Sequence, residues 1–456
     1  MTAMRVQRLA AGLGRLGYRL VTLTEIGVKK PVFGCQACGQ CVLSQTGLIC
    51  PMRCPKMLRN GPCGGSANGF CEVYPDRPCV WIQINQRAQR LGWTNRLRRL
   101  RWPVDWSLKG SSSWMNYLAG KDRPPSHASI LTRSATSTTT LPRSALEKAL
   151  KSGQFVVTAE VGPPRNANPE TIRRKVALLR GFVDAVNLTD NQRAVVHMSS
   201  LAASVLAQQE GLEAIAQMTA RDRNRIALQS DLLGAAALGI RNMLLLTGDH
   251  PRHGNHPDAK AVFDLDAAQM VMAARGLRDH GLFLSGDDLK GDPALARPQL
   301  FLGVAANPDL EPLEVELLRL ERKIDAGAEF VQTQGVFDLA RFERWMAAVR
   351  ERGLHKRAYF LVGVLLVRSA RAAQVMKSEV PGIHMPDDLY RRIVEAANPA
   401  EEGIRLGIDT VQRLRRIEGV RGVHLMAIGW EEAIPRVVEG AGLLPRPTNV
   451  QPAAVA

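Results

Sequence analysis

The chain contains 456 residues, of which 45% are hydrophobic and 23% charged, and it carries a formal net charge of +17 at pH 7. This length allows a large barrel of about 250 residues beside a smaller module. The apolar run Phe360–Val367 is far shorter than the roughly 18 residues that a membrane span needs. We therefore expect a two-part cytoplasmic protein without a membrane span.

The positive charge is concentrated in the first third of the chain. Residues 1–145 contain 21 lysines and arginines against 5 acidic residues, whereas residues 146–456 contain 39 against 38. This asymmetry indicates an acidic partner, which could be nucleic acid, an anionic membrane surface or an acidic protein. Residues 1–30 form a basic segment that resembles a transit peptide but lacks the apolar core of a secretory signal, so we favour a basic docking helix.

All eight cysteines lie within residues 35–79, a stretch rich in glycine and proline. Without a secretory signal, metal ligation is a better interpretation than a disulfide framework. The first three have the C-x2-C-x2-C spacing of iron–sulfur proteins, and eight thiolates match two 4Fe-4S clusters, with zinc in one or both sites as the alternative. The predicted metal ligands are Cys35, Cys38, Cys41, Cys50, Cys54, Cys63, Cys71 and Cys79.

The cysteine-rich domain is predicted to span residues 31–120 and to end in a tail rich in arginine and tryptophan. Residues 81–120 hold five of the seven tryptophans. Interleaved aromatic and basic residues can bind single-stranded nucleic acid or a membrane interface, but they also anchor protein interfaces. We favour a clamp onto the second domain. Residues 121–145, rich in Ser, Thr and Pro, are predicted to form a linker.

From residue 146 onward, short apolar runs alternate with amphipathic segments. Eight strands are predicted at Phe155–Val161, Ala185–Leu188, Ala214–Met218, Asn242–Leu246, Phe301–Ala305, Phe330–Thr333, Tyr359–Leu365 and Val423–Ala427. Eight strands separated by helices over about 300 residues are typical of an α/β fold, the (β/α)8 TIM barrel, whose active site lies at the carboxyl ends of the strands. The barrel is predicted over residues 146–445, followed by a flexible tail over 446–456.

The stretch 217–251 carries the clearest pattern. A helix is predicted to begin near Arg225, capped by Asp222 or Asn224, and to end at Gly239. The next strand ends at a glycine turn that places Asp249 at the strand's carboxyl end, where barrels bind ligands; a helix cap is the alternative role. The other predicted strand ends carry Glu160, Thr189, Asp190, Thr219, Arg221, Thr247, Asn307 and Gln334. Without a nucleophile or a histidine cluster, such a site is expected to use a cofactor's reactivity.

Five segments together carry a family resemblance. They are AEVGPPR (159–165), LTGDHP (246–251), VAANPD (304–309), ERKIDAGAEFVQTQGVFD (321–338) and VPGIHMPD (380–387). With these motifs, about residues 150–445 resemble methylenetetrahydrofolate reductase. The cysteine segment is similar to the cysteine-rich subunit or fused domain that accompanies the reductases of acetogenic bacteria, where it is linked to iron–sulfur electron transfer.

The resemblance implies a flavin at the barrel mouth, with Glu160 as the general acid that protonates the folate amine. This role requires a carboxyl with a raised pKa. Asp249 would stabilise the iminium cation that forms when the folate ring opens, and Gln334 would bind the pterin. The matched cofactor positions are Thr189, Gln217, Thr219, Thr247, Phe263, Asp264, Asn307, Glu316 and Lys323.

Three of these positions depart from the better-known bacterial enzymes. Gln217 replaces a histidine, Thr247 an arginine and Asn307 a tyrosine, which leaves both FAD and FMN open as the cofactor. The implied activity is reduction of methylenetetrahydrofolate, with electrons from NAD(P)H or from an acidic carrier such as ferredoxin or flavodoxin.

Two other functions are compatible with the sequence. One is a pterin-dependent methyltransferase barrel, and the other is a polyanion-binding scaffold with a zinc-stabilised N-terminal module. Nucleic acid is not an expected partner, and homo-oligomerisation is left open.

Overall fold

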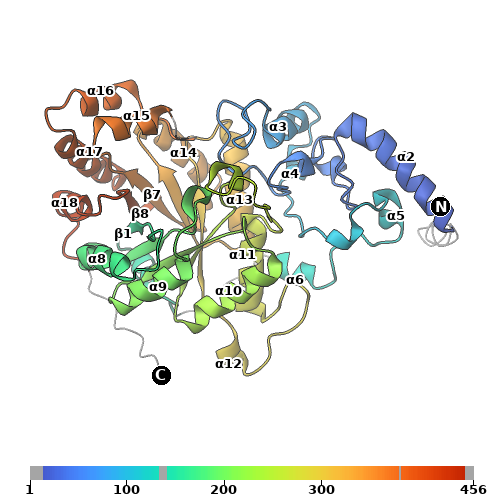
Figure 1. Cartoon of the computed structure of the whole chain (residues 1–456), viewed down its shortest axis with the longest axis horizontal. Helices are drawn as coiled ribbons and strands as arrows, with labels where there is room; N and C mark the ends of the chain where they lie inside the picture. Colours follow the sequence, from blue (N-terminus) through green and yellow to red (C-terminus); the bar gives the residue numbers. More distant parts are fainter. Residues whose placement is uncertain (1–13, 133–140, 379, 381, 447–456) are drawn as a thin grey trace.

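The computed structural model describes residues 14–132, 141–378, 380 and 382–446. Eight apolar runs in this part of the chain form parallel strands that pair in sequence order and close into a barrel (Figure 1). The strands are β1 (Val156–Val161), β2 (Ala185–Leu188), β3 (Ala214–Thr219), β4 (Asn242–Leu246), β5 (Phe301–Ala306), β6 (Phe330–Gly335), β7 (Tyr359–Leu365) and β8 (Val420–Met426). The predicted TIM barrel is confirmed.

Amphipathic helices surround the strands. They are α8 (Glu170–Leu179), α9 (Ser200–Gln209), α10 (Arg225–Ala237), α11 (Ala267–Arg275), α13 (Leu313–Ala326), α14 (Leu339–Glu351), α15 (Ala370–Ser378), α16 (Asp387–Val394), α17 (Pro399–Leu414) and α18 (Ala433–Gly440). A four-residue helix without a buried residue, α12 (Pro293–Ala296), lies in the segment before β5. The helix predicted after Asp222 is α10: the Asn224 side chain accepts hydrogen bonds from the amides of Ile226 and Ala227, and Gly239 follows with φ of 78°. Asn224, not Asp222, is therefore the cap.

A short helix, α7 (Ala145–Lys151), closes the end of the barrel where the strands begin. Leu146 and Leu150 are fully buried against the first residues of several strands, including Phe301 and Phe330. Glu213, just before β3, accepts hydrogen bonds from the amides of Ala145 and Leu146. Since α7 covers this end and TIM barrels bind their ligands at the carboxyl ends of the strands, the candidate site is sought at those ends, called here the barrel mouth.

The N-terminal module (residues 31–120) contains little regular structure between residues 34 and 79. Its helices and the flanking ones are α2 (Arg15–Phe33), α3 (Val80–Arg90), α4 (Thr94–Leu97), α5 (Ser113–Leu118) and α6 (Ala128–Thr132). The predicted N-terminal helix is α2 as far as the structure describes it; residues 1–13 and the predicted tail from 447 onward lie outside the described residues, as do residues 133–140 of the predicted linker.

The module packs against the side of the barrel that carries α11 and α13 (Figure 1). Trp81 is buried in a cluster with Leu318 of α13, and the indole Nε1 of Trp106 donates to Asp264 at 2.7 Å. Tryptophans of the Arg/Trp-rich tail thus hold the module on the barrel, as expected for a clamp. Within the described residues, no helix is long and apolar enough to cross a membrane.

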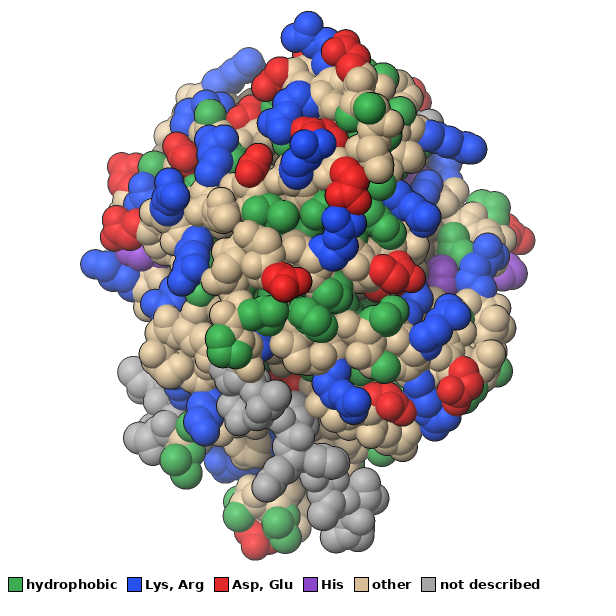
Figure 2. Space-filling model, turned by 90° about the vertical axis from the view of Figure 1, so that its left-hand side faces the viewer, with side chains coloured by type: hydrophobic (Ala, Val, Ile, Leu, Met, Phe, Trp, Pro, Cys, Tyr) green, Lys and Arg blue, Asp and Glu red, His purple; other side chains and the backbone are tan. Residues whose placement is uncertain are grey.

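The opposite side of the barrel has a mixed surface. Lysines, arginines and acidic residues are interspersed over the face in Figure 2. This agrees with the near balance of charge in residues 146–456 and leaves the positive excess on the N-terminal side of the molecule.

Candidate active site at the barrel mouth

Glu160 lies near the end of β1, with its side chain 26% exposed. Its Oε2 is 3.9 Å from Nε2 of His424, a buried residue of β8. The other ring nitrogen of His424, Nδ1, lies 3.0 Å from Oγ1 of Thr158. No local pattern in the sequence marks His424, since a single histidine within an apolar strand is more often a satisfied core residue than a functional one.

Polar side chains continue from Thr158 into the barrel interior. The amide of Gln332 donates to Thr158 Oγ1 at 3.3 Å, and Asn187 and Gln332 exchange two hydrogen bonds of 2.6 and 3.1 Å. All three residues are buried. Since buried polar groups cost free energy unless they are paired, this network fixes the orientation of the groups beneath Glu160.

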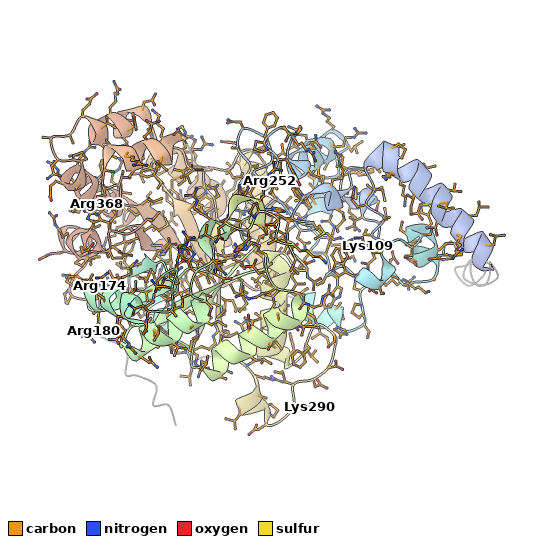
Figure 3. The ribbon with its side chains drawn as sticks, viewed as in Figure 1. Lys109, Arg174, Arg180, Arg252, Lys290 and Arg368 are labelled. Atoms are coloured by element: carbon orange, nitrogen blue, oxygen red, sulfur yellow. The ribbon has the colours of Figure 1, made fainter. Side chains whose placement is uncertain are left out.

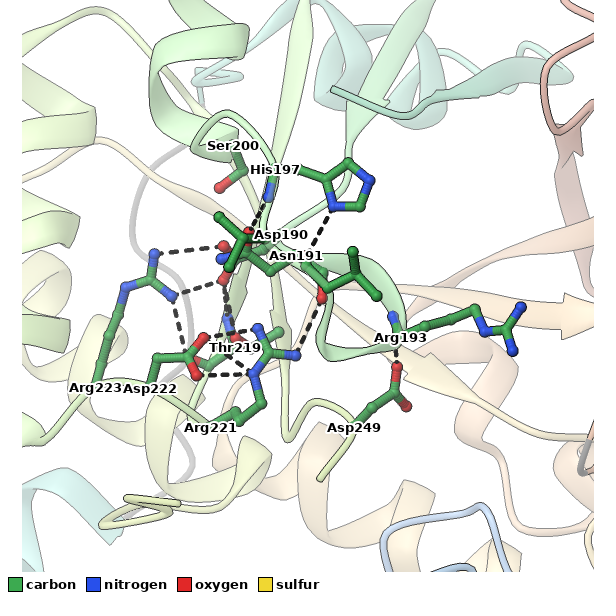
Figure 4. Close-up of polar contacts among 12 residues, drawn as sticks. Asp190, Asn191, Arg193, His197, Ser200, Thr219, Arg221, Asp222, Arg223 and Asp249 are labelled. Carbon is green, nitrogen blue, oxygen red and sulfur yellow. Dashed lines mark hydrogen bonds and ion pairs between the residues drawn. The ribbon is translucent and has the colours of Figure 1, made fainter. Parts of the chain in front are cut away.

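Asp249 follows the glycine turn at the end of β4, and it is exposed. Its Oδ2 accepts a hydrogen bond of 2.9 Å from the backbone amide of Arg193, in the loop after β2 (Figure 4). Gly248 takes φ of 86°, a conformation that side chains rarely adopt, and a β-carbon there would lie 2.9 Å from Thr219 Cβ. The carboxylate is therefore positioned by two neighbouring loops of the mouth.

The loop after β2 is held in an unusual conformation. Asn191, Arg193 and Ala194 all have φ between 49° and 57°, a region that non-glycine residues seldom occupy. Such conformations persist only where the surrounding contacts impose them, and they cluster at functional sites. Here the contacts include Arg221 Nη1 donating to the Asn191 carbonyl at 3.1 Å.

Asp190 anchors the base of this loop. Its buried carboxylate accepts from the amide and the hydroxyl of Thr219, both at 2.9 Å, and from Arg223 at 2.6 Å (Figure 4). The amide and the hydroxyl of Thr219, a predicted cofactor residue, are thus already hydrogen-bonded within the protein. Thr189 is likewise bonded through its hydroxyl to Gln192, at 2.6 Å.

The predicted cofactor residues fall into two groups by their surroundings. Thr189, Thr219 and Thr247 follow or end β2, β3 and β4, and Gln217 lies two residues before the end of β3, so these residues are on the same side of the mouth as Asp249. Phe263, Asp264, Asn307, Glu316 and Lys323 lie toward the N-terminal module. Gln334, the predicted pterin ligand, lies at the end of β6 with an exposed side chain.

The module directly contacts the second group. Asn307 Nδ2 donates to the Gly64 carbonyl at 3.1 Å. Glu316 is fully buried between the Asn307 amide and Arg319, and Arg319 in turn donates to the Cys63 carbonyl at 2.7 Å. Several positions that the resemblance assigns to cofactor binding therefore also form the junction between the two parts of the chain.

Lys323 is buried in this junction, and its ammonium donates to the Ala305 carbonyl at 2.6 Å. Burial, and then the neighbouring charge of Arg319, lower its pKa to about 7. The adjacent Arg322 is 1% exposed, stacks on Trp81, and has no hydrogen-bond partner for any of its three guanidinium nitrogens within the described residues. A buried guanidinium without a hydrogen-bond partner fits an anionic group such as a cofactor phosphate.

The eight cysteines separate into two sets of four. Cys35, Cys38, Cys41 and Cys50 line one cavity beneath α2. The other four interact electrostatically: the charge of Cys79 acts on Cys54, that of Cys54 acts on Cys63, and that of Cys71 acts on Cys79. This division into sets could not be deduced from the spacing alone.

Burial raises the pKa of Cys50 to about 11 and that of Cys54 to about 12, and neighbouring thiolates add to the effect. A bound cation would reverse this effect, because metals bind thiols in their deprotonated form. The donor set thus fits a thiophilic metal. Across the described ranges, however, no group of three or more histidine, cysteine and acidic side chains is arranged to hold a metal ion, so the predicted metal sites stay predictions.

A parallel eight-stranded barrel that is closed at one end and carries carboxylates and amides at the other is typical of TIM-barrel enzymes. A family profile described as methylenetetrahydrofolate reductase matches residues 145–442. The chain belongs to this family, and it is an oxidoreductase. A second profile, methylene-tetrahydrofolate reductase C terminal, matches residues 19–107.

Individual relatives agree with the family profile. A probable methylenetetrahydrofolate reductase (NADPH) of Caenorhabditis elegans is 25% identical over 338 residues, covering 71% of this chain and 46% of that protein. The 5,10-methylenetetrahydrofolate reductase of Salmonella typhimurium is 24% identical over 315 residues, covering 66% and 97%. The chain thus matches about half of the worm protein and nearly all of the bacterial one.

Among solved structures, an uncharacterised protein from Clostridium thermocellum that binds two copies of 5-methyl-5,6,7,8-tetrahydrofolic acid covers 65% of this chain and 98% of its own, with 13% identity and a TM-score of 0.46.

Proposed function

We propose that the protein reduces methylenetetrahydrofolate to methyltetrahydrofolate at the barrel mouth, with a flavin as the hydride donor. The observation that carries this proposal is the joint placement of Glu160, Asp249 and Gln334 at the carboxyl ends of β1, β4 and β6, in a chain of the methylenetetrahydrofolate reductase family. The residues at this rim are of the types that the reaction needs: an acid, a stabilising carboxylate and an amide.

Glu160 acts as the general acid. Protonation of the folate amine breaks the carbon–nitrogen bond of the five-membered ring and leaves an iminium ion at the methylene carbon. The half-buried carboxyl near His424 can be reached from the mouth while the network of Thr158, Gln332 and Asn187 holds its surroundings rigid. A positioned acid of this kind typically contributes about 10²–10⁴-fold to the rate.

Asp249 stabilises the positive charge that develops when the ring opens. Its carboxylate is held by the Arg193 amide, so no reorganisation is needed at the moment of reaction. Gln334 offers an amide that can both donate to and accept from the pterin edge. A flavin bound beside these groups would supply the hydride that converts the iminium carbon to a methyl group.

The flavin could be FAD or FMN. Gln217, Thr219 and Thr247 would hold it near the strand ends, and the unpaired Arg322 beside Lys323 supports a phosphate at the junction. Three of the predicted cofactor residues are already engaged, Thr219 by Asp190, Asp264 by Trp106 and Asn307 by Gly64, so they would have to exchange partners to bind the flavin.

For the N-terminal module we propose two metal sites, each formed by one set of four cysteines. Two 4Fe-4S clusters remain our preferred assignment, with zinc in one or both sites as the alternative. If iron–sulfur clusters are bound, the electrons would come from a reduced acidic carrier such as ferredoxin or flavodoxin; if only zinc is bound, NAD(P)H would be the donor at the flavin.

Anaerobic purification followed by flavin, iron, sulfide and zinc analysis tests the cofactor content. Oxidation of methyltetrahydrofolate with a small dye acceptor tests the activity independently of the electron donor. We expect a yellow-brown protein that oxidises methyltetrahydrofolate. A colourless protein that binds polyanions and shows no folate turnover would instead support the scaffold alternative.

A further inference from the structure

One lysine of the N-terminal module reaches the active-site turn of the barrel. Lys56 is 3% exposed, and its Nζ donates to the Gly248 carbonyl at 2.7 Å. The same ammonium forms an ion pair with Glu72 of the module and lies 5.8 Å from the ring centroid of Phe263. The turn that carries Asp249 is therefore bound on one side by a residue 192 positions away in the sequence.

A second contact strengthens this side of the junction. Arg252, which Figure 3 places where the barrel meets the module, stacks 4.9 Å from the ring centroid of Tyr74. A buried ammonium is costly unless it is paired, and Lys56 satisfies this requirement with one partner from the module and one from the barrel. The Gly248 carbonyl is thereby fixed next to the carboxylate that the reaction uses.

The ion pair lies in the segments of the module that carry the second cysteine set. Cys54 precedes Lys56 by two residues, and Cys71 directly precedes Glu72.

We propose that Lys56 is a positioning residue of the folate-reducing site: the N-terminal module completes the barrel mouth by holding the Gly248 carbonyl and, through it, Asp249. This inference rests on the proposed function. It predicts that the barrel's chemistry depends on the module even when a small dye replaces the physiological electron partner, because the contribution is one of geometry.

The test compares Lys56→Met with Glu72→Gln in the full chain. Both changes remove the same ion pair, but Glu72→Gln leaves the ammonium in place to bind Gly248. We expect Lys56→Met to lower kcat for dye-linked methyltetrahydrofolate oxidation by about tenfold or more, with flavin and metal content retained, while Glu72→Gln causes a much smaller loss. Lys121→Met, at an exposed lysine of the linker, is the control and should match the wild type.

Equal losses in Lys56→Met and Glu72→Gln would overturn the proposal, because the ion pair would then matter only for the module's stability. Wild-type kcat in Lys56→Met would overturn it as well. If Lys56→Met does not retain its metal or flavin, the double variant Lys56→Met/Glu72→Met is measured in its place. Replacing both partners of a buried ion pair leaves no unpaired charge in the interior. A loaded double variant with reduced kcat supports the proposal, and one with wild-type kcat refutes it. Absence of turnover in the wild type would refute the proposed function instead.

Discussion

At the scale of single residues, Glu160 has the most specific predicted role. Glu160→Gln should lower kcat for methyltetrahydrofolate oxidation by about 10²–10⁴-fold, because an amide cannot exchange the proton that ring opening and closure require. Flavin content and flavin reduction by a chemical reductant should not change. The control is Glu170→Gln, at an exposed residue in the first turn of α8. Near wild-type turnover in Glu160→Gln would rule this residue out as the acid.

Lys323 provides a pH-dependent prediction. Its pKa is lowered from 10.5 to about 7, so between these values the unfolded chain binds more protons than the folded one, and stability rises with pH. The cost of burying the charge is fully present below pH 7 and is lost by about pH 10.5. Lys323→Met should therefore raise the melting temperature relative to the wild type near pH 6.5, and this advantage should shrink as the pH approaches 10. An advantage that does not change with pH would contradict the assigned cause.

The sequence identified rim residues where a motif or a strand end marked them, as for Glu160 and Asp249. It did not identify His424 or Lys56. The role of His424 depends on β8 closing the barrel beside β1, and that of Lys56 depends on how an irregular module docks. Contacts between residues far apart in the sequence leave no local pattern from which they could be read.

At the scale of elements, the loops after β2 and β4 are packed with little room between them. A β-carbon at Gly254 would overlap the carbonyl oxygen of Ala194, so Gly254→Ala should push the loops apart and break the bond between Asp249 and the Arg193 amide. We expect KM for methyltetrahydrofolate to rise or kcat to fall by about tenfold or more, measured by dye-linked kinetics.

Gly234 offers the matched comparison. A β-carbon at this position of α10 would meet no atom within 4 Å, so Gly234→Ala should leave the kinetics unchanged and stabilise the helix by about 0.5–1 kcal/mol. Denaturant titration measures this change in the free energy of unfolding. A kinetic defect in Gly234→Ala as large as that in Gly254→Ala would show that the loop contact is not responsible.

Most strands were predictable because they are short apolar runs followed by glycine or a polar residue. Only β8 begins earlier than predicted, at Val420 instead of Val423, because Arg421 and Gly422 interrupt the apolar run. The course of residues 34–79 could not be predicted, since a segment without hydrophobic periodicity carries no signal for its path.

At the scale of the molecule, the charge asymmetry predicts how an acidic electron carrier would associate. Arg59, Arg99, Arg101 and Arg123 line one groove together with Trp102 and Cys41. Arg99→Glu/Arg123→Glu should slow reduction of the protein by a plant-type ferredoxin, and the wild-type rate should fall with salt as the Debye length shrinks from ~30 Å at 0.01 M to ~10 Å at 0.1 M.

Two exposed arginines of the barrel provide the control for that experiment. Arg174 and Arg180 lie at the opposite end of the molecule from Lys109 of the module (Figure 3), so Arg174→Glu/Arg180→Glu changes the net charge equally without altering the groove. If both double variants slow the ferredoxin reaction to the same extent, only net charge matters and the groove is not the docking site.

The module and the barrel contact each other through described elements on either side of residues 133–140. The module meets the barrel mouth, α6 packs on α11 through Leu131, and α7 lies at the opposite, closed end of the barrel. The two parts adhere through buried contacts such as those of Lys56, Trp81 and Trp106. A chain cut between Thr132 and Leu141 should therefore remain a stable complex of two polypeptides, with the covalent connection serving mainly to raise the effective concentration of one part near the other.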